Sequence, residues 1–350
     1  MNKIDFNEND KIAILDIISY QPHDRHRACI TLIEPSLDVE FESPTASLGN
    51  FRVLPCEIFD WVIKHSTMHA VSSLRAVNRR MRLLVDTSLP YKGIISNAPH
   101  VRATLERTGV APHFTVEEVF WILTHGACRV CGDLGLYLWI PDLERCCYNC
   151  LREEPDLMPM SERDARAAYG LTARQMGQLP VMVSLPGNYK VSTTSRRKTS
   201  KFVSETRARQ LGCAVHGGDD GLSKYIASSN TKAKAAYDKR LAKRSRPMSH
   251  DSHGRVNNTV DSIERYLVSV YLPYLDLESY TSHTGQACVG CRIAVSRARS
   301  LPYNDLTALI RRCGKVYTKE GLLNHFKECA AAQDLWHTKQ VHRVVSDRVH

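Results

Sequence analysis

The sequence predicts a mainly helical protein that contains small cysteine-rich modules of mixed α and β structure. Three observations lead to this prediction. Apolar residues recur at helical spacing behind capping residues, cysteines occur in close pairs, and a polar, basic stretch separates two compact parts. The chain has 350 residues, of which 43% are hydrophobic and 24% are charged, which excludes wholly disordered and fibrous classes. Such a length suits about two ordinary domains.

The composition also indicates the compartment. The longest apolar run, Leu134 to Ile140, is far shorter than the roughly 18 residues that would span a bilayer. The first ten residues lack the apolar core of a secretory signal, so we expect an intracellular protein of the cytoplasm or nucleus, without a membrane association. In a reducing compartment, the twelve cysteines are expected to hold metal or stay free rather than form disulfides.

The pattern divides the chain into five parts. Residues 190–250 contain fifteen Lys or Arg and four Asp or Glu, a local balance of +11, so the net charge of +10 belongs to this segment. The first fifty residues show no sustained apolar period. We therefore expect a loosely ordered tail over residues 1–50, a group of short helices over 51–95, a cysteine-rich module over 96–190, a basic linker over 191–258 and a C-terminal helical module over 259–350.

Three short helices are expected between residues 52 and 86, where apolar residues recur at intervals of three and four. Leu54-Pro55 opens the first helix, because proline is pre-shaped for a helix start and its missing N–H costs nothing there. A break at Ser66-Thr67 precedes the second. The apolar residues are Ile58, Phe59, Val62 and Ile63 in the first helix, Val71, Leu74 and Val77 in the second, and Met81, Leu84 and Val85 in the third.

The cysteine-rich module contains a four-cysteine pattern that is typical of structural zinc. Cys128-x₂-Cys131 and Cys147-x₂-Cys150 are fifteen residues apart, within the spacing of known zinc sites. A two-residue gap lets both thiolates of one turn reach a single tetrahedral ion, and Gly132 allows the chain to turn away sharply. The apolar segment Leu134 to Ile140 is expected to be a buried strand or hairpin arm that returns to the second pair. Cys146 is the alternative to Cys147.

A second zinc site is expected in the C-terminal module. Cys288-x₂-Cys291 resembles the first half of a zinc finger, and His325-x₃-Cys329 resembles its second half with cysteine in place of the last histidine. Residues at i and i+4 share one face of a helix, so His325 and Cys329 can bind the same ion. The interval between the halves is longer than in an ordinary finger, and Cys313 is therefore an alternative ligand. We expect two structural Zn²⁺ ions in total.

The stretch from Leu54 to Val85 resembles an F-box in its Leu-Pro-x-Glu-Ile opening and its Val77-Asn-Arg-Arg-Met-Arg-Leu-Leu ending. The wider stretch to Tyr189 is similar to fungal F-box proteins that continue with a cysteine-rich module; Cys128-Arg-Val-Cys-Gly, Glu144-Arg-Cys-Cys-Tyr-Asn-Cys and Ser184-Leu-Pro-Gly-Asn-Tyr carry this likeness. The resemblance implies a three-helix F-box followed by a zinc-stabilised receptor region. It also implies docking on a Skp-type linker subunit, and through it on a cullin, to recruit a substrate protein for ubiquitination.

The expected docking face consists of Leu54, Pro55, Ile58, Val62 and Ile63, while Leu74, Val77 and Met81 are expected to complete the helical fold. Two departures from the F-box pattern stand out. Ser66-Thr67 replaces the usual Leu-Pro, and Ala70 stands where an Asp or Ser cap is common, so we expect the second helix to lose about 1 kcal/mol of capping and docking to be weaker than average.

An enzyme is not expected, because the sequence contains no phosphate loop, dinucleotide-binding turn, nucleophile elbow or H-E-x-x-H motif. The alternative to an adaptor is a zinc-containing nucleic-acid-binding regulator that uses residues 190–250 and the C-terminal finger-like helix. The basic segment has few aromatic residues, which argues against a stacking platform for single strands. It is also compatible with a nuclear import signal or a solvated linker helix.

Overall fold

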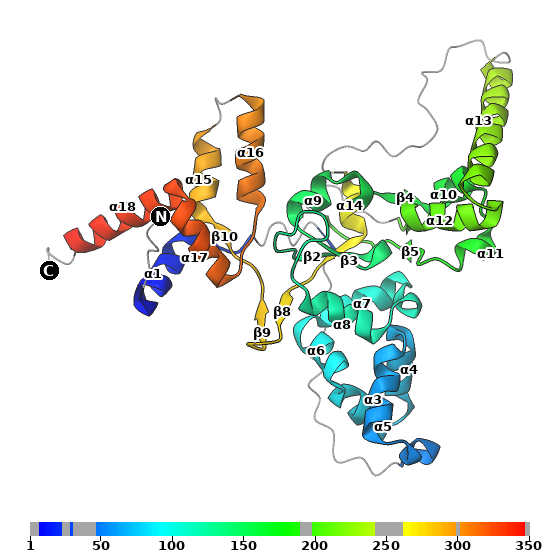
Figure 1. Cartoon of the computed structure of the whole chain (residues 1–350), viewed down its shortest axis with the longest axis horizontal. Coiled ribbons are helices and arrows are strands. Elements are labelled where there is room, and N and C mark those ends of the chain that lie inside the picture. Colours follow the sequence, from blue (N-terminus) through cyan, green and yellow to red (C-terminus); the bar gives the residue numbers. More distant parts are fainter. Residues whose placement is uncertain are drawn as a thin grey trace.

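The computed structural model describes residues 7–22, 29–30, 47–189, 198–241, 262–298 and 302–346. Over these ranges the chain is mainly helical, and its strands form four antiparallel sheets of two or three strands (Figure 1). This confirms a mainly α protein with small antiparallel sheets near two cysteine-rich clusters. Within the same ranges, none of the helices combines the length and the apolar character that crossing a membrane would require.

The three short helices expected between residues 52 and 86 form at the expected positions. Thr67 caps the second helix, since its hydroxyl accepts a hydrogen bond from the backbone N–H of Ala70 at 3.2 Å. The expected loss of capping is therefore wrong: the side chain that replaces the usual proline is itself a good cap. Asn78 caps the third helix in the same way. The elements are the 3₁₀ turn η1 (Gly49–Val53) and the helices α3 (Cys56–His65), α4 (Met68–Val77) and α5 (Arg79–Thr87).

These helices share one hydrophobic core with the elements that follow, so no structural break occurs near residue 95. The turn between α3 and α4 pairs with the segment before α8: the N–H of Met68 donates to the carbonyl of Phe114 at 2.8 Å, and that of Val116 donates to Ser66 at 3.0 Å. The expected boundary between residues 51–95 and 96–190 therefore does not separate two structural units. The following elements are α6 (Leu89–Asn97), α7 (Pro99–Thr108), η2 (Ala111–His113) and α8 (Val116–Thr124).

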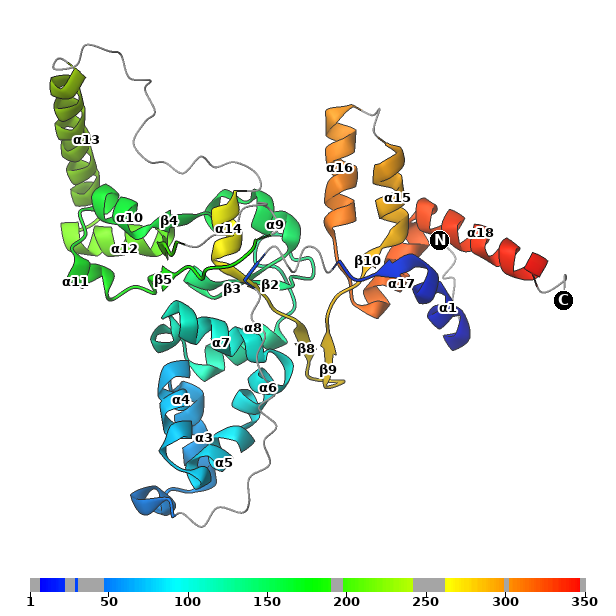
Figure 2. The same cartoon turned by 180° about the vertical axis from the view of Figure 1, so that it is seen from behind.

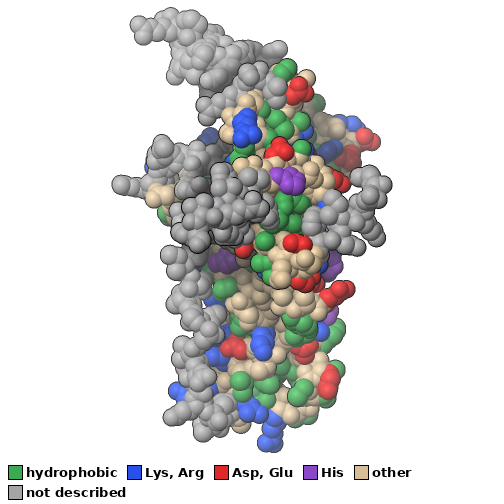
Figure 3. Space-filling view, turned by 90° about the vertical axis from the view of Figure 1, so that its left-hand side faces the viewer, with side chains coloured by type: hydrophobic (Ala, Val, Ile, Leu, Met, Phe, Trp, Pro, Cys, Tyr) green, Lys and Arg blue, Asp and Glu red, His purple; other side chains and the backbone are tan. Residues whose placement is uncertain are grey.

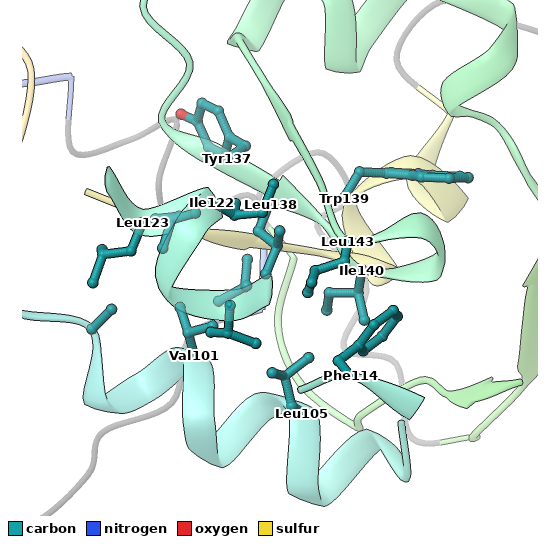
Figure 4. Packing of buried hydrophobic residues seen from close by; sticks show 14 of the residues in the cluster. Val101, Leu105, Phe114, Ile122, Leu123, Tyr137, Leu138, Trp139, Ile140 and Leu143 are labelled. Carbon is teal, nitrogen blue, oxygen red and sulfur yellow. The ribbon is translucent and has the colours of Figure 1, made fainter. Parts of the chain in front are cut away.

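A three-stranded sheet lies above α7 and α8, in the order β3-β2-β7. The apolar segment at Leu134 to Ile140 supplies β2, which confirms the expected hairpin arm, and Tyr137 pairs with Cys146 on one side and with Tyr271 on the other. Figure 4 shows side chains of α7, α8 and β2 converging on the common core. The elements are β2 (Tyr137–Trp139), η3 (Ile140–Asp142), β3 (Glu144–Cys146) and β7 (Ser269–Tyr271), preceded by α14 (Ile263–Leu267).

Strand β7 corrects the expected start of the C-terminal module at residue 259. Tyr266, Leu267 and Val270 are fully buried in the same core as β2. Residues 263–272 therefore belong to the cysteine-rich module, although about 130 residues of chain separate β7 from its partner β2. A β-hairpin, β8 (Tyr274–Asp276) and β9 (Thr281–His283), then leads away from this core.

The expected basic linker is partly a folded unit. Strand β6 is the central strand of a second sheet, in the order β4-β6-β5, and its Val203 is fully buried. The expectation of a linker is therefore wrong for residues 198–241, whereas residues 190–197 and 242–261 lie outside the described ranges. The elements are α9 (Tyr148–Glu153), η4 (Pro155–Leu157), β4 (Pro159–Ser161), α10 (Glu162–Tyr169), α11 (Ala173–Met176), β5 (Met182–Val183), β6 (Lys201–Ser204), α12 (Glu205–His216) and α13 (Asp219–Leu241).

The C-terminal unit includes helix α1 from the N-terminal part of the chain (Figure 2). Ile14 and Ile18, one helical turn apart, are fully buried beside Leu322 and Phe326. The expectation of a loosely ordered tail is therefore wrong for residues 7–22, because this segment forms α1, which buries two isoleucines, and β1, which pairs with β10. Residues 1–6, 23–28 and 31–46 of that tail are not described. The elements are α1 (Glu8–Ile18), β1 (Ser19–Tyr20), β10 (Ala287–Cys288), α15 (Val289–Arg297), α16 (Tyr303–Gly314), α17 (Lys319–Glu328) and α18 (Ala330–Ser346).

Candidate metal centres

The first candidate centre begins at a turn between α8 and β2. Cys128 and Cys131 lie on this turn, which is closed by hydrogen bonds from the N–H of Gly132 to the carbonyl of Cys128 at 2.9 Å and from the N–H of Cys128 to the carbonyl of Asp133 at 2.7 Å. Gly132 has a φ of +77°, in the left-handed region that glycine adopts without strain. The turn therefore directs two sulfur atoms to one side while the chain continues into the hairpin.

The second half of the first centre lies where β3 passes into α9. Cys147 is the N-cap of α9, and its sulfur accepts a hydrogen bond from the N–H of Cys150 at 3.4 Å. The sulfur atoms of all four cysteines lie within 4.8 Å of one another, with Cys131 and Cys147 at 3.6 Å. We call Cys128, Cys131, Cys147 and Cys150 the first centre.

Cys146 is not part of the first centre. It lies on β3, fully buried and paired with Tyr137, and its burial raises the pKa of its thiol well above the ordinary value. Adjacent residues of a strand point to opposite faces, so only one of Cys146 and Cys147 can face the other sulfurs. Of the two alternatives, the structure brings Cys147 to the group.

The thiols of the first centre differ in their pKa values. The hydrogen bond from Cys147 lowers the pKa of Cys128 to about 4. The same contact raises the pKa of Cys147, which keeps its proton as the donor, and burial raises the pKa of Cys150 to about 12. A divalent cation that displaces these protons would be held by four thiolates, a donor set that leaves no open coordination position. The group is thus compatible with a structural metal site.

Two buried arginines hold the elements that carry the first centre. The Arg145 side chain donates to the backbone carbonyls of five residues at 2.5–3.3 Å, namely Ile122, Leu123, Gly135, Leu272 and Pro273. Arg265 donates to the carbonyls of Leu151 and Glu154 at the end of α9. Arg145 thus provides donors for the carbonyls of Ile122 and Leu123 in the last turn of α8, and Arg265 does so for that of Leu151 in the last turn of α9. Sequence reasoning missed both residues, because arginine is usually found at the surface.

The second candidate centre joins β10, α15 and α17. Cys288, Cys291, His325 and Cys329 place their ligand atoms within 4.8 Å of one another, and we call them the second centre. The sulfur of Cys291 lies 3.3 Å from Nε2 of His325 and 3.8 Å from the sulfur of Cys329. Cys313, the alternative ligand, is not in this group. The second centre is compatible with another structural metal site.

Tyr317 orients the histidine of the second centre. The Tyr317 hydroxyl lies 3.3 Å from Nδ1 of His325, and the two rings stack with centroids 4.8 Å apart. This contact at Nδ1 leaves Nε2 directed at the sulfur atoms. Metal-binding histidines are commonly oriented in this way by a partner on the other ring nitrogen. Hydrogen bonds to the Cys288 and Cys329 sulfurs raise the pKa of His325 to about 9, so a metal ion must displace a proton from the imidazole at neutral pH.

The residues of the expected docking face divide into two groups. Leu54, Pro55 and Ile58 are exposed, and Val62 is partly exposed. Ile63 is fully buried, so its assignment to a docking face is wrong: it lies on the opposite side of α3, toward the core.

The three residues expected to complete the fold also differ in their exposure to solvent. Met81 is buried and Leu74 is partly buried against the core, whereas Val77 is 65% exposed and belongs with the surface. Sequence reasoning missed Trp61, which is 59% exposed on the same side of α3 as Ile58. Its spacing of three residues from Ile58 was the available signal.

Comparisons of the chain with protein-family models, with curated proteins and with solved structures give no match. The features on which a function can be argued are therefore the two candidate centres and the exposed side of α3. All residues of the two centres and of this side of α3 lie in the described ranges.

Proposed function

We propose that the chain is a non-catalytic substrate adaptor of a cullin-RING ubiquitin ligase of the SCF type. The F-box-like helices would dock on a Skp-type linker subunit, and the zinc-stabilised remainder would recruit a target protein. The observation that carries this proposal is a set of large apolar side chains that the fold leaves in solvent: Leu54, just before α3, is 38% exposed, and Ile58 and Trp61 on α3 are 49% and 59% exposed. They occupy the register at which the sequence resembles an F-box.

Ile58 and Trp61 lie on one face of α3 because they are three residues apart in the helix. Val77 at the end of α4 and Val53 before α3 are also largely exposed. Contiguous apolar surface of this kind marks an interaction site, and tryptophan is among the residues that most often anchor interfaces. A partner with an apolar groove would cover the face by the helix-in-groove mode.

The two candidate centres are best matched by Zn²⁺. Four cysteines at the first centre and three cysteines with one histidine at the second are donor sets of structural zinc, because zinc accepts tetrahedral sulfur and nitrogen ligands without redox chemistry. With all four positions taken by protein, neither ion could bind and activate a substrate. We therefore assign the metal to folding, and the adaptor function to surfaces that the zinc-stabilised fold presents.

A nucleic-acid-binding regulator is the competing proposal. Helix α13 carries exposed Lys232, and the segment around it is the most basic in the sequence. However, acidic and basic side chains of the described residues are interspersed rather than gathered by sign on the side of the molecule that Figure 3 shows. An electrostatic footprint for phosphates needs basic side chains gathered on one face, and the described residues do not present one on this side.

The adaptor proposal is tested by the affinity of the zinc-loaded full chain for a purified Skp-type linker, measured by calorimetry. Ile58→Ala removes a central anchor, and such truncations commonly cost about 2 kcal/mol or more, roughly thirtyfold in affinity. Val215→Ala is the matched control, since Val215 is a similarly exposed aliphatic residue on α12. A folded, zinc-loaded wild-type chain that does not bind the linker would refute the proposal.

A further inference from the structure

The turns that hold the first centre also contact the C-terminal unit. Asp133, two residues after Cys131, accepts an ion-pair hydrogen bond from Nζ of Lys315 at 2.9 Å, and it lies 3.6 Å from the Cys131 sulfur. Asn149, between Cys147 and Cys150, donates from Nδ2 to the carbonyl of Arg311 at 2.7 Å. Both halves of the first centre therefore bind the same short segment, residues 311–317.

The 311–317 segment also holds the second centre. Its last residue, Tyr317, contacts Nδ1 of His325 through its hydroxyl. The backbone of Tyr317 exchanges hydrogen bonds of 2.8 and 2.9 Å with Gln286, two residues before the ligand Cys288. One residue of the segment thus touches both the histidine and the strand that leads to the first cysteine pair of the second centre.

The segment fits closely between the two centres. A Cβ at Gly314 would lie 1.9 Å from Oδ1 of Asn149, so a larger residue there would displace the Asn149 side chain that binds the Arg311 carbonyl. Val316 is 6% exposed and lies in the same core cluster as Cys128 and Cys147. The segment can therefore not shift on one centre without breaking packing at the other.

We infer that the two centres bind metal cooperatively, and that the coupling passes from Asp133 through Lys315 to Tyr317 and His325. This inference rests on the proposed metal binding at both centres. The element with two states is the 311–317 segment, which is either docked on the formed turns of the first centre or released from them. A metal ion in the first centre fixes those turns, docks the segment and pre-orients His325.

The coupling is reciprocal, because an effect of one bound metal on the affinity for the other must act equally in both directions. A metal ion in the second centre fixes His325 and Tyr317, and thereby presents Lys315 to Asp133. We expect each bound ion to raise the affinity of the other centre by about tenfold, within the usual range of coupling between sites.

The test measures the occupancy of each centre separately in the full chain. Zinc-loaded protein is incubated with graded concentrations of a zinc chelator and then with a cysteine-alkylating reagent. Peptide mapping then reports which cysteines have lost their metal. In the wild-type chain, the cysteines of both centres should become reactive over the same range of chelator. In Lys315→Met the two ranges should separate, with the weaker centre losing its metal at about tenfold lower chelator concentration.

Tyr317→Phe is the decisive variant, because the hydroxyl that it removes contacts His325, a ligand of the second centre. The coupling predicts that the first centre also loses affinity in this variant, which a purely local role of Tyr317 would not produce. Lys201→Met is the matched control: it removes a comparable ion pair, with Glu162 at 3.3 Å, outside the network, and should leave both ranges unchanged.

Two results would overturn the coupling. Either Lys315→Met leaves both ranges where they are in the wild-type chain, or Tyr317→Phe weakens the second centre alone. If native mass spectrometry finds no zinc on the folded wild-type chain, the metal proposal itself fails, and this outcome is distinct from two independent zinc sites.

Discussion

Replacing Arg145 by methionine should destabilise the protein more than any surface substitution. The side chain is 3% exposed, and all of its donor nitrogens hydrogen-bond to buried backbone carbonyls. Burial lowers the pKa of Arg145 to about 10, so the guanidinium remains charged at neutral pH. Methionine fills much of the same volume with an apolar chain. The substitution therefore removes the hydrogen bonds while creating little cavity.

The magnitude follows from the carbonyls that lose their donor. An unsatisfied buried polar group costs about 1–3 kcal/mol, and five carbonyls from three separate segments depend on Arg145. Local relaxation and entering water recover part of this cost. We expect a loss of about 3–5 kcal/mol, the usual cost of breaking a buried charged network, against a total stability of roughly 5–15 kcal/mol.

Urea denaturation of the zinc-loaded chain, followed by tryptophan fluorescence and far-UV circular dichroism, measures this loss. Arg145→Lys keeps the charge but offers a single ammonium, which cannot reach all three segments, so it should lose more than half as much stability. Arg209→Met is the control, since Arg209 forms an exposed pair with Asp219, and it should change stability by less than about 0.5 kcal/mol. An Arg145→Met protein within about 1 kcal/mol of wild type would show that Arg145 does not hold the three segments together.

Two further predictions concern the metal and the basic segment. Chelation of zinc, or Cys128→Ser, should unfold the core that the cysteine-rich module shares with α3–α8 and β7, as seen by circular dichroism and proteolysis, because structural zinc contributes apparent binding free energies of roughly 10–16 kcal/mol. Metal analysis should return about two Zn²⁺ per chain, and soluble, folded protein without zinc would contradict this. Deletion of residues 231–247 should leave the affinity for the linker unchanged. If the deletion instead abolishes nucleic-acid binding that persists at physiological salt, with a log–log salt slope of about −0.9 per phosphate contacted, the competing function gains support.

The local features of the molecule were predictable from the sequence. Two residues separate the cysteines of each pair, and the histidine lies four residues before a cysteine. These spacings depend only on the geometry of one turn or one helix. The structure brings these residues together as the spacing predicts. The hairpin arm at β2 was equally local, because an apolar run of seven residues fits a strand that is buried on both faces.

The long-range features had no comparable signal. Strand β7 reaches β2 across about 130 residues of chain, and nothing in its own residues specifies that partner. Helix α1 buries only Ile14 and Ile18, too few apolar residues to produce a clear helical period. Arg145 and Arg265 were missed for a related reason, since a buried arginine is identified by the carbonyls around it, and these come from several distant segments.

Helix α8 connects the proposed docking end of the protein to the first centre. Its beginning is tied to the turn between α3 and α4 by the hydrogen bond from Val116 to Ser66, and its last turn is held by Arg145, which also binds the strand that leaves the first centre. Nine residues of helix span about 13 Å at 1.5 Å per residue. An adaptor must hold its target at a fixed position relative to the ligase, and a short helix fastened at both ends resists bending better than a flexible linker. If the F-box-like helices dock as proposed, loss of zinc from the first centre should therefore release the receptor region from the docked helices.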